Sequence, residues 1–270
     1  MSSPVTVRDA GGYRVWSMDF APVNALSPEL LGALDAELDS ALADESTAAI
    51  VLTSGLKVFS AGADATWMGE TAQARGVDGL VEEFIRTMDT FRALCERMRR
   101  SPLLFVGVLG GHTLAGGLEL AAACDIRYAA DNERIRIGVP EMDLFGAMPS
   151  GGGGVQYLTR LMGASRALHF VLDAKPVNPQ QAYAAGLVDR LVAPEELLGE
   201  AEAFARSVAD KAGRVGVGAA KRAIFGGGEQ PLSAALELDR ALHWDAVRRG
   251  NFRRGVEAFV QQFASGGKGR

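Results

Sequence analysis

Val58-Phe59-Ser60-Ala61-Gly62-Ala63-Asp64 and Leu114-Ala115-Gly116-Gly117-Leu118-Glu119-Leu120 are the two stretches that decide the fold of this chain. Each follows an apolar run typical of a strand, leads into a helical pattern and has small residues where the backbone changes direction. Backbone N–H groups at the start of a helix lack intrahelical acceptors and can point at a bound anion. Two such corners that face each other can hold the oxygen of a carbonyl that is turning into an oxyanion.

The composition limits the class of protein and of partner. The chain has 270 residues, 48% of them apolar and 23% charged, which is typical of a soluble globular protein with a large core. The net charge of -5 argues against nucleic acid as a partner, because phosphate binding needs a basic face. Residues 1–5 lack the pattern of a signal peptide, and no apolar run approaches the roughly 20 residues of a membrane helix. We therefore expect a cytoplasmic protein with no membrane or nucleic-acid partner.

Strand and helix signals alternate along the first part of the chain. Ser27 suits the N-cap of a helix and Pro28 its first position, and a long helix is expected over residues 77–99. The expected strands are residues 5–7, 14–19, 48–53, 103–109, 126–130, 135–138 and 187–192. A recurrent strand–helix order implies parallel strands with right-handed crossovers. Because helical patterns dominate after Gln156, we expect an α/β core over residues 1–200 and a helical region over residues 201–270.

Several common catalytic sites are excluded by residue spacing. The glycine run at residues 151–154 is not followed by Lys-Ser or Lys-Thr and does not fit GxGxxG, so it is not a phosphate-binding loop. No GxSxG nucleophile elbow is present. The three histidines and the two cysteines have no metal-ligand spacing, so the sequence predicts no metal site.

A pair of glutamates remains as candidate acid and base. Glu119 follows Gly116 by three residues, so the two lie on one face of the helix that the second corner opens. Glu141 follows the rigid Pro140 and precedes an apolar, glycine-rich stretch, where desolvation raises the pKa of a carboxyl group. From the residues alone, a capping or surface role stays the default for each glutamate.

At this point six segments, in order along the chain, resemble the crotonase family of enoyl-CoA hydratases and isomerases. They are residues 59–64, 111–121, 124–129, 139–141, 158–163 and 182–189. The resemblance implies repeated ββα turns that form a spiral, with C-terminal helices that drive trimerisation. Hexamers built as dimers of trimers are common in the family. It also implies an acyl-CoA thioester substrate and no metal or redox cofactor, since coenzyme A is part of the substrate.

The resemblance also implies roles for individual residues. The backbone N–H groups of Ala63 and Gly116 match the oxyanion hole, and Glu119 and Glu141 match the acid/base glutamates of hydratases. Trp67 and Met68 match the lining of the acyl pocket, although burial in the core explains these two equally well. The remaining residues expected to bind coenzyme A or substrate are Ala25, Lys57, Ser60, Ala61, Gly62, Asp64, Ala65, Gly117 and Pro140.

Three departures from the family pattern affect the substrate expectation. The basic residue often found just before the Asn-Ala-Leu segment of residues 24–26 is missing, so Lys57 is the candidate to meet a phosphate of coenzyme A. The loop of residues 142–150 is about one residue longer than usual and borders the acyl pocket, so the acyl group need not be a simple straight chain. The last helix, near residues 259–263, lacks the frequent basic end.

The two glutamates favour one reaction over three alternatives. Hydration of a 2-enoyl-CoA uses both, and both positions are filled. A double-bond isomerase needs a single base, for which Glu141 suffices, and another crotonase-type acyl-CoA lyase is a further alternative. A protein that binds coenzyme A without catalysis is less favoured, because both glutamates and both small corner residues are present.

Overall fold

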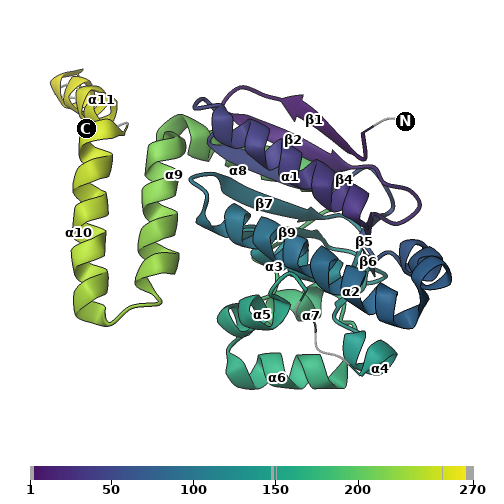
Figure 1. Cartoon of the computed structure of the whole chain (residues 1–270). Coiled ribbons are helices and arrows are strands. Elements are labelled where there is room, and N and C mark those ends of the chain that lie inside the picture. Colours follow the sequence, from purple (N-terminus) through teal and green to yellow (C-terminus); the bar gives the residue numbers. More distant parts are fainter. Residues whose placement is uncertain (1–2, 147–148, 150, 251, 266–270) are drawn as a thin grey trace.

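The computed structural model describes residues 3–146, 149, 151–250 and 252–265, and a twisted six-stranded sheet forms its centre (Figure 1). The strand order is β1 (Val5–Asp9), β2 (Tyr13–Met18), β4 (Ala49–Ser54), β7 (Leu104–Leu109), β9 (Ile126–Ala130) and β11 (Arg190–Val192). β1 and β2 form an antiparallel hairpin, and every other neighbouring pair is parallel. The predicted parallel α/β core is therefore confirmed.

Two small sheets lie beside the central one and create the ββα repeat. One has the order β10 (Ile137–Gly138), β8 (His112–Leu114), β5 (Val58–Ser60), and the other pairs β3 (Ala25–Leu26) with β6 (Gly62–Ala63). The chain passes from a strand of the central sheet through one or two short strands into a helix four times, starting at β2, β4, β7 and β9. The strand expected at 135–138 is shorter, because Ile135 N–H closes a turn on Asn132 O.

Side-chain caps mark the start of the first two helices. The Ser27 hydroxyl accepts the Leu30 N–H at the start of α1 (Pro28–Ala43), as predicted. The helix expected over residues 77–99 is the larger part of α2 (Ala65–Arg100). α2 starts earlier because Asp64 Oδ1 accepts the N–H groups of Thr66 and Trp67 at 2.9 and 3.0 Å. Gly76, at φ 72°, separates the two parts of α2.

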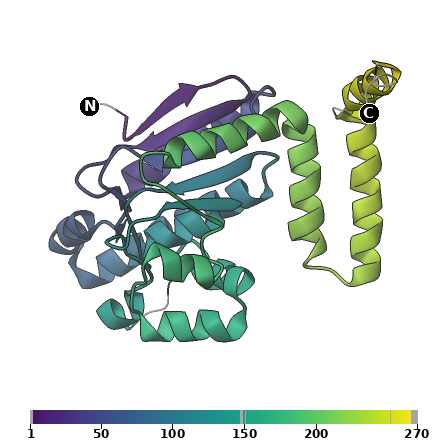
Figure 2. The same cartoon turned by 180° about the vertical axis from the view of Figure 1, so that it is seen from behind.

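α1 covers one face of the central sheet, and α8 (Leu197–Lys211) covers the other (Figures 1 and 2). α3 (Gly116–Ala123) packs against the two small sheets, α5 (Gly154–Met162) packs on α3, and α6 (Ala164–Asp173) packs on α5. The remaining helices of this part of the chain are α4 (Glu141–Phe145) and α7 (Pro179–Ala184). The loop after α4 contains residues 147, 148 and 150, so the expectation of a longer loop falls partly outside the described residues.

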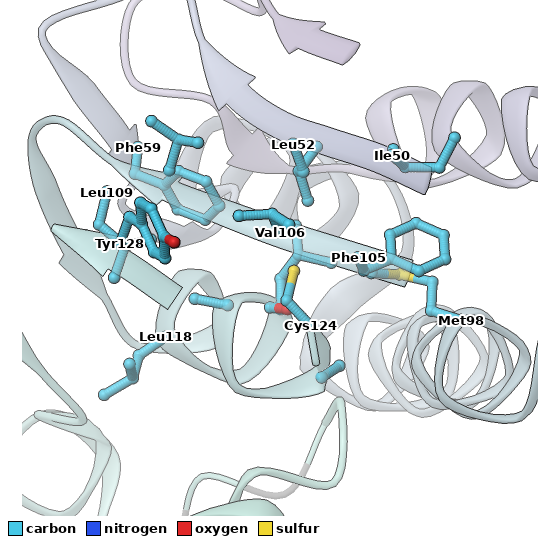
Figure 3. Packing of buried hydrophobic residues seen from close by; sticks show 14 of the residues in the cluster. Ile50, Leu52, Phe59, Met98, Phe105, Val106, Leu109, Leu118, Cys124 and Tyr128 are labelled. Atoms are coloured by element: carbon cyan, nitrogen blue, oxygen red, sulfur yellow. The ribbon is translucent and has the colours of Figure 1, made fainter. Parts of the chain in front are cut away.

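Apolar side chains from the strands and from α2 fill the space below the central sheet. Figure 3 shows Ile50, Phe105 and Met98 gathered at one end of this core, and Phe59, Leu109 and Tyr128 at the other. All six are less than 5% exposed. The core therefore extends from α2 to the short strand β5, which precedes the first corner.

The C-terminal helices stand to one side of the sheet (Figure 1). They are α9 (Gly213–Lys221), a π-helical turn at Arg222–Gly226, α10 (Leu232–Arg249) and α11 (Phe252–Ser265). The expected domain boundary after residue 200 lies inside α8, whose Ala201 and Ala205 are fully buried against the core. The part of the chain that leaves the sheet begins at α9, and the division into two domains stays a prediction. No helix within the described residues is long and apolar enough to cross a membrane.

Candidate active site

The fold brings the two small-residue corners into contact. β6 pairs with β3, so that Gly62 lies opposite Ala25 and Ala63 opposite Leu26. A Cβ on Gly62 would lie 2.5 Å from the Ala115 Cβ and 3.1 Å from the Gly116 backbone nitrogen, so only glycine allows this approach. The first corner therefore rests directly on the start of α3.

Ala115 gives the second corner an unusual backbone conformation. Its φ of 51° and ψ of -131° lie outside the regions that L-residues favour, at a cost of about 1–3 kcal/mol. The Ala115 N–H donates to Gly138 O of β10 at 2.8 Å, which helps to hold this conformation. α3 then begins at Gly116, whose N–H is one of those without an intrahelical acceptor.

Asn24 holds the first corner, a role that the sequence reasoning missed. It is fully buried, and its Nδ2 donates to Phe59 O at 3.0 Å and to Ser54 Oγ at 2.8 Å. The Ser60 hydroxyl donates back to Asn24 O at 2.7 Å. The signal available in the sequence was a single amide side chain directly before Ala25 and Leu26.

Glu119 lies in the first turn of α3 and is only 4% exposed. Its Oε2 accepts the N–H groups of Gly152 at 2.9 Å and of Gly154 at 2.7 Å. Burial raises the pKa of Glu119, and the N–H groups of Gly154 and Gly152 oppose that shift. The sequence predicts the position of Glu119, but it does not predict that the glycine run at residues 151–154 donates hydrogen bonds to the carboxylate.

Glu141 begins α4 in a different environment. It is half-buried, and its Oε2 is buried with no hydrogen-bond partner in the part of the chain that the structure describes. Burial raises the pKa of Glu141 to about 7, and the negative charge of Glu119 adds to the shift. The predicted direction of this pKa shift is therefore confirmed. The two carboxyl groups form a pair in contrasting settings, which is how acid and base roles are separated in proteins.

The remaining predicted binding residues differ in exposure. Ser60, Gly62 and Gly117 are buried, and the hydroxyl of Ser60 and the carboxylate of Asp64 are used within the fold. Lys57, Ala61 and Ala65 are exposed. The half-buried residues of this set are Ala25, Asp64, Trp67, Met68 and Pro140.

No group of three or more His, Cys, Asp or Glu side chains within the described residues could hold a metal ion. The absence of a metal and of a separate cofactor stays a prediction from the family resemblance.

Comparison with known proteins decides the family. The sequence model described as Enoyl-CoA hydratase/isomerase matches residues 15–265, which is most of the chain. The chain belongs to the enoyl-CoA hydratase/isomerase family. This confirms the crotonase resemblance that the six segments indicated, and it makes the protein an enzyme of that family by relationship.

Relatives of this family member include both single enzymes and longer proteins. The 2,3-dehydroadipyl-CoA hydratase of Escherichia coli (strain K12) is 34% identical over 250 residues, 92% of this chain and 91% of that protein. A glyoxysomal fatty acid beta-oxidation multifunctional protein MFP-a of Brassica napus is 34% identical over 202 residues, 75% of this chain. The match spans only 27% of that plant protein's length.

Solved structures confirm the crotonase-like fold of this family member. An enoyl-CoA hydratase from Bacillus anthracis superposes with a TM-score of 0.86 at 26% identity, and the match covers 96% of both chains. The repeated ββα order described above is therefore the architecture of the family.

Some of the segments that resemble the family serve the fold. Arg127 is 1% exposed and donates from Nη2 to Asp189 Oδ2 at 2.7 Å and from Nε to Leu187 O at 2.7 Å. These bonds join β9 to the chain that leads into β11. Asp125 binds Lys221 Nζ at 2.8 Å and thereby connects β9 to α9.

Proposed function

We propose that this protein is an enoyl-CoA hydratase, which adds water across the C2=C3 bond of a 2-enoyl-CoA thioester. The observation that carries the proposal is the pair of glutamates in contrasting settings. Glu119 is doubly hydrogen-bonded by backbone N–H groups, whereas Glu141 has a buried oxygen without a partner among the described residues. Hydration requires one group that takes a proton from water and a second group that gives a proton to C2.

The two corners supply the electrostatic part of the mechanism. In our proposal the N–H groups of Ala63 and Gly116 receive the thioester oxygen. As water attacks C3, the π electrons of the C2=C3 bond move toward that oxygen and form an enolate. Each preorganised donor contributes about 3 kcal/mol to stabilising this charge. The contact of Gly62 with Ala115 and Gly116 supports the placement, because it sets the two corners side by side.

The glutamates divide the proton transfers between them. Glu119, whose Oε2 is held by two backbone N–H donors, takes a proton from the water as the C3–O bond forms. Glu141, whose pKa is raised to about 7 by burial, gives its proton to C2 as the enolate collapses to the thioester. The product gains one water in total, and the proton that Glu119 accepted returns to Glu141 through solvent.

The assembly that we propose is a homotrimer, alone or paired as a hexamer, formed through the C-terminal helices. A groove of about 440 Å³ lies where α10 and α11 meet the end of α8 and the start of α9, and Val247 and Val256 are among the apolar residues that line it. Leu232, Leu236 and Trp244 of α10 are more than half exposed. These exposed apolar side chains on the C-terminal helices support the burial of α10 against further copies of the chain.

The reaction is tested by supplying purified protein with crotonyl-CoA and following the loss of the enoyl thioester absorbance. We expect hydration of this substrate and of other 2-enoyl-CoA thioesters. Turnover of a 3-enoyl-CoA without hydration of any 2-enoyl-CoA would instead establish an isomerase that uses Glu141 as its base. Binding of coenzyme A without turnover of either substrate class would establish a non-catalytic protein.

A further inference from the structure

The carboxylate of Glu119 lies at the N-terminus of α5. Gly154, one of its two donors, is the first residue of that helix, and Gly152 lies two residues earlier. Hydrogen bonds to an ionised carboxylate are stronger than neutral ones, and the positive end of a helix dipole favours a negative charge. This environment opposes the rise in pKa that the burial of Glu119 causes.

The contact depends on the absence of side chains in the glycine run. A Cβ on Gly154 would lie 2.6 Å from Glu119 Cγ and 2.7 Å from Glu119 Oε2. A Cβ on Gly152 would lie 2.7 Å from ring carbons of Phe91 in α2. The run is therefore held between α2 and Glu119, and any larger residue at position 154 must displace the carboxylate.

We propose that Gly152 and Gly154 are positioning residues for the reaction: their N–H groups hold Oε2 of Glu119 and thereby fix the orientation of the carboxylate toward the attacking water. The inference rests on the proposed hydratase function. Within the described residues, the buried Oε2 of Glu141 has no hydrogen-bond donor. The two glutamates therefore differ in hydrogen bonding because the glycine run donates only to Glu119. The competing explanation is that Glu119 only caps α5 and serves stability.

The first test measures the pKa of Glu119 directly and needs no substrate. The protein is labelled with ¹³C at the glutamate carboxyl carbons, the Glu119 signal is assigned with Glu119→Gln, and its pKa is compared between wild type and Gly154→Ala. We expect this pKa to rise by about 1 in Gly154→Ala, because the displaced carboxylate loses donors. Gly218→Ala is the matched control, since a Cβ there would lie 2.9 Å from Pro102 Cβ and meets neither glutamate among its nearest neighbours. An unchanged Glu119 pKa in Gly154→Ala overturns the proposal.

The second test separates positioning from stability. We expect Gly154→Ala to lower kcat for crotonyl-CoA about 10- to 100-fold with KM nearly unchanged, and to add no further loss in a Glu119→Gln background. An equal further loss in that background, or a normal kcat, overturns the proposal. If Gly154→Ala does not fold, Gly152→Ala takes its place. Should wild type hydrate no 2-enoyl-CoA, the proposed function fails, while the carboxyl titration still decides whether the glycines hold Glu119.

Discussion

At the scale of single residues, the candidate site contains two glutamates whose carboxyl groups differ in burial and in hydrogen bonding. Glu119 is buried among backbone N–H donors, and Glu141 is half-buried with one oxygen that no described residue satisfies. The positions of both were predictable, because each stands at a recognisable place relative to a corner or a proline. The donors of Glu119 were not predictable, since they lie 33 and 35 residues further along and no local signal links them.

The raised pKa of Glu141 predicts a cost in stability that depends on pH. Its folded-state pKa of about 7 lies above the ordinary 4.5, so the folded state favours the protonated carboxyl group. That stabilisation is complete below pH 4.5 and is lost as the pH rises through 7. Glu141→Gln should therefore have a higher free energy of unfolding than wild type at pH 8, by about 2 kcal/mol after allowance for solvent screening.

Urea unfolding at pH 8 and at pH 5 measures this difference. We expect the advantage of Glu141→Gln to shrink as the pH falls toward 5. An advantage of the same size at both pH values would show that ionisation of Glu141 is not its cause.

At the scale of elements, the start and end of each helix followed from local chemistry where a capping residue was present. Ser27 with Pro28 located α1, and the periodic apolar residues located the second part of α2. The first part of α2 was not predicted, because Gly76 interrupts the periodic pattern of apolar residues. Asp64, which caps this helix, was expected to bind substrate instead. The short strands β3 and β6 have only two residues each, too few for a periodic signal, whereas β10 lies within the strand expected at residues 135–138.

A buried ion pair helps to join α9 to the core. Lys221 is 6% exposed, and its Nζ lies 2.8 Å from Asp125 Oδ2 and donates to Leu103 O at 2.6 Å. Lys221→Met leaves the Asp125 charge buried without its partner, so we expect a loss of about 3–5 kcal/mol in the free energy of unfolding.

Chemical denaturation of Lys221→Met beside Lys175→Met checks this expectation. Lys175 pairs with Asp173 at 2.8 Å on the surface, where its side chain is 75% exposed, so its removal should change stability little. Equal, small effects of both substitutions would refute the structural role of the buried pair.

At the scale of the whole molecule, the sequence pattern predicts the central sheet, whereas only the family resemblance implies the ββα spiral and the assembly through the C-terminal helices. The alternation of strands and helices predicted a parallel sheet, and every neighbouring pair of the central sheet apart from β1 and β2 is parallel. The spiral of ββα repeats was implied only by the family resemblance, because periodicity cannot show that short strands leave the main sheet. Assembly into trimers stays a prediction for the same reason.

Substitution on α10 tests the proposed assembly. Leu236 is 58% exposed, and a charge there would be buried without a partner in an interface between copies. We expect Leu236→Glu to shift the protein from trimer toward monomer in analytical ultracentrifugation, whereas Leu168→Glu on α6, 61% exposed, leaves the trimer intact. A wild-type monomer, or a trimer that withstands Leu236→Glu, would contradict a trimer held by α10.

In the proposed reaction, Glu119 and Glu141 together hydrate an enoyl thioester that other residues bind. The measurement that tests it most directly is kcat for crotonyl-CoA hydration by wild type, Glu119→Gln and Glu141→Gln, with the Kd for coenzyme A measured in parallel. We expect each substitution to lower kcat by about 10²- to 10⁴-fold, because each removes one proton-transfer group, while the Kd stays within about twofold. Near-normal turnover in both variants would contradict the claim.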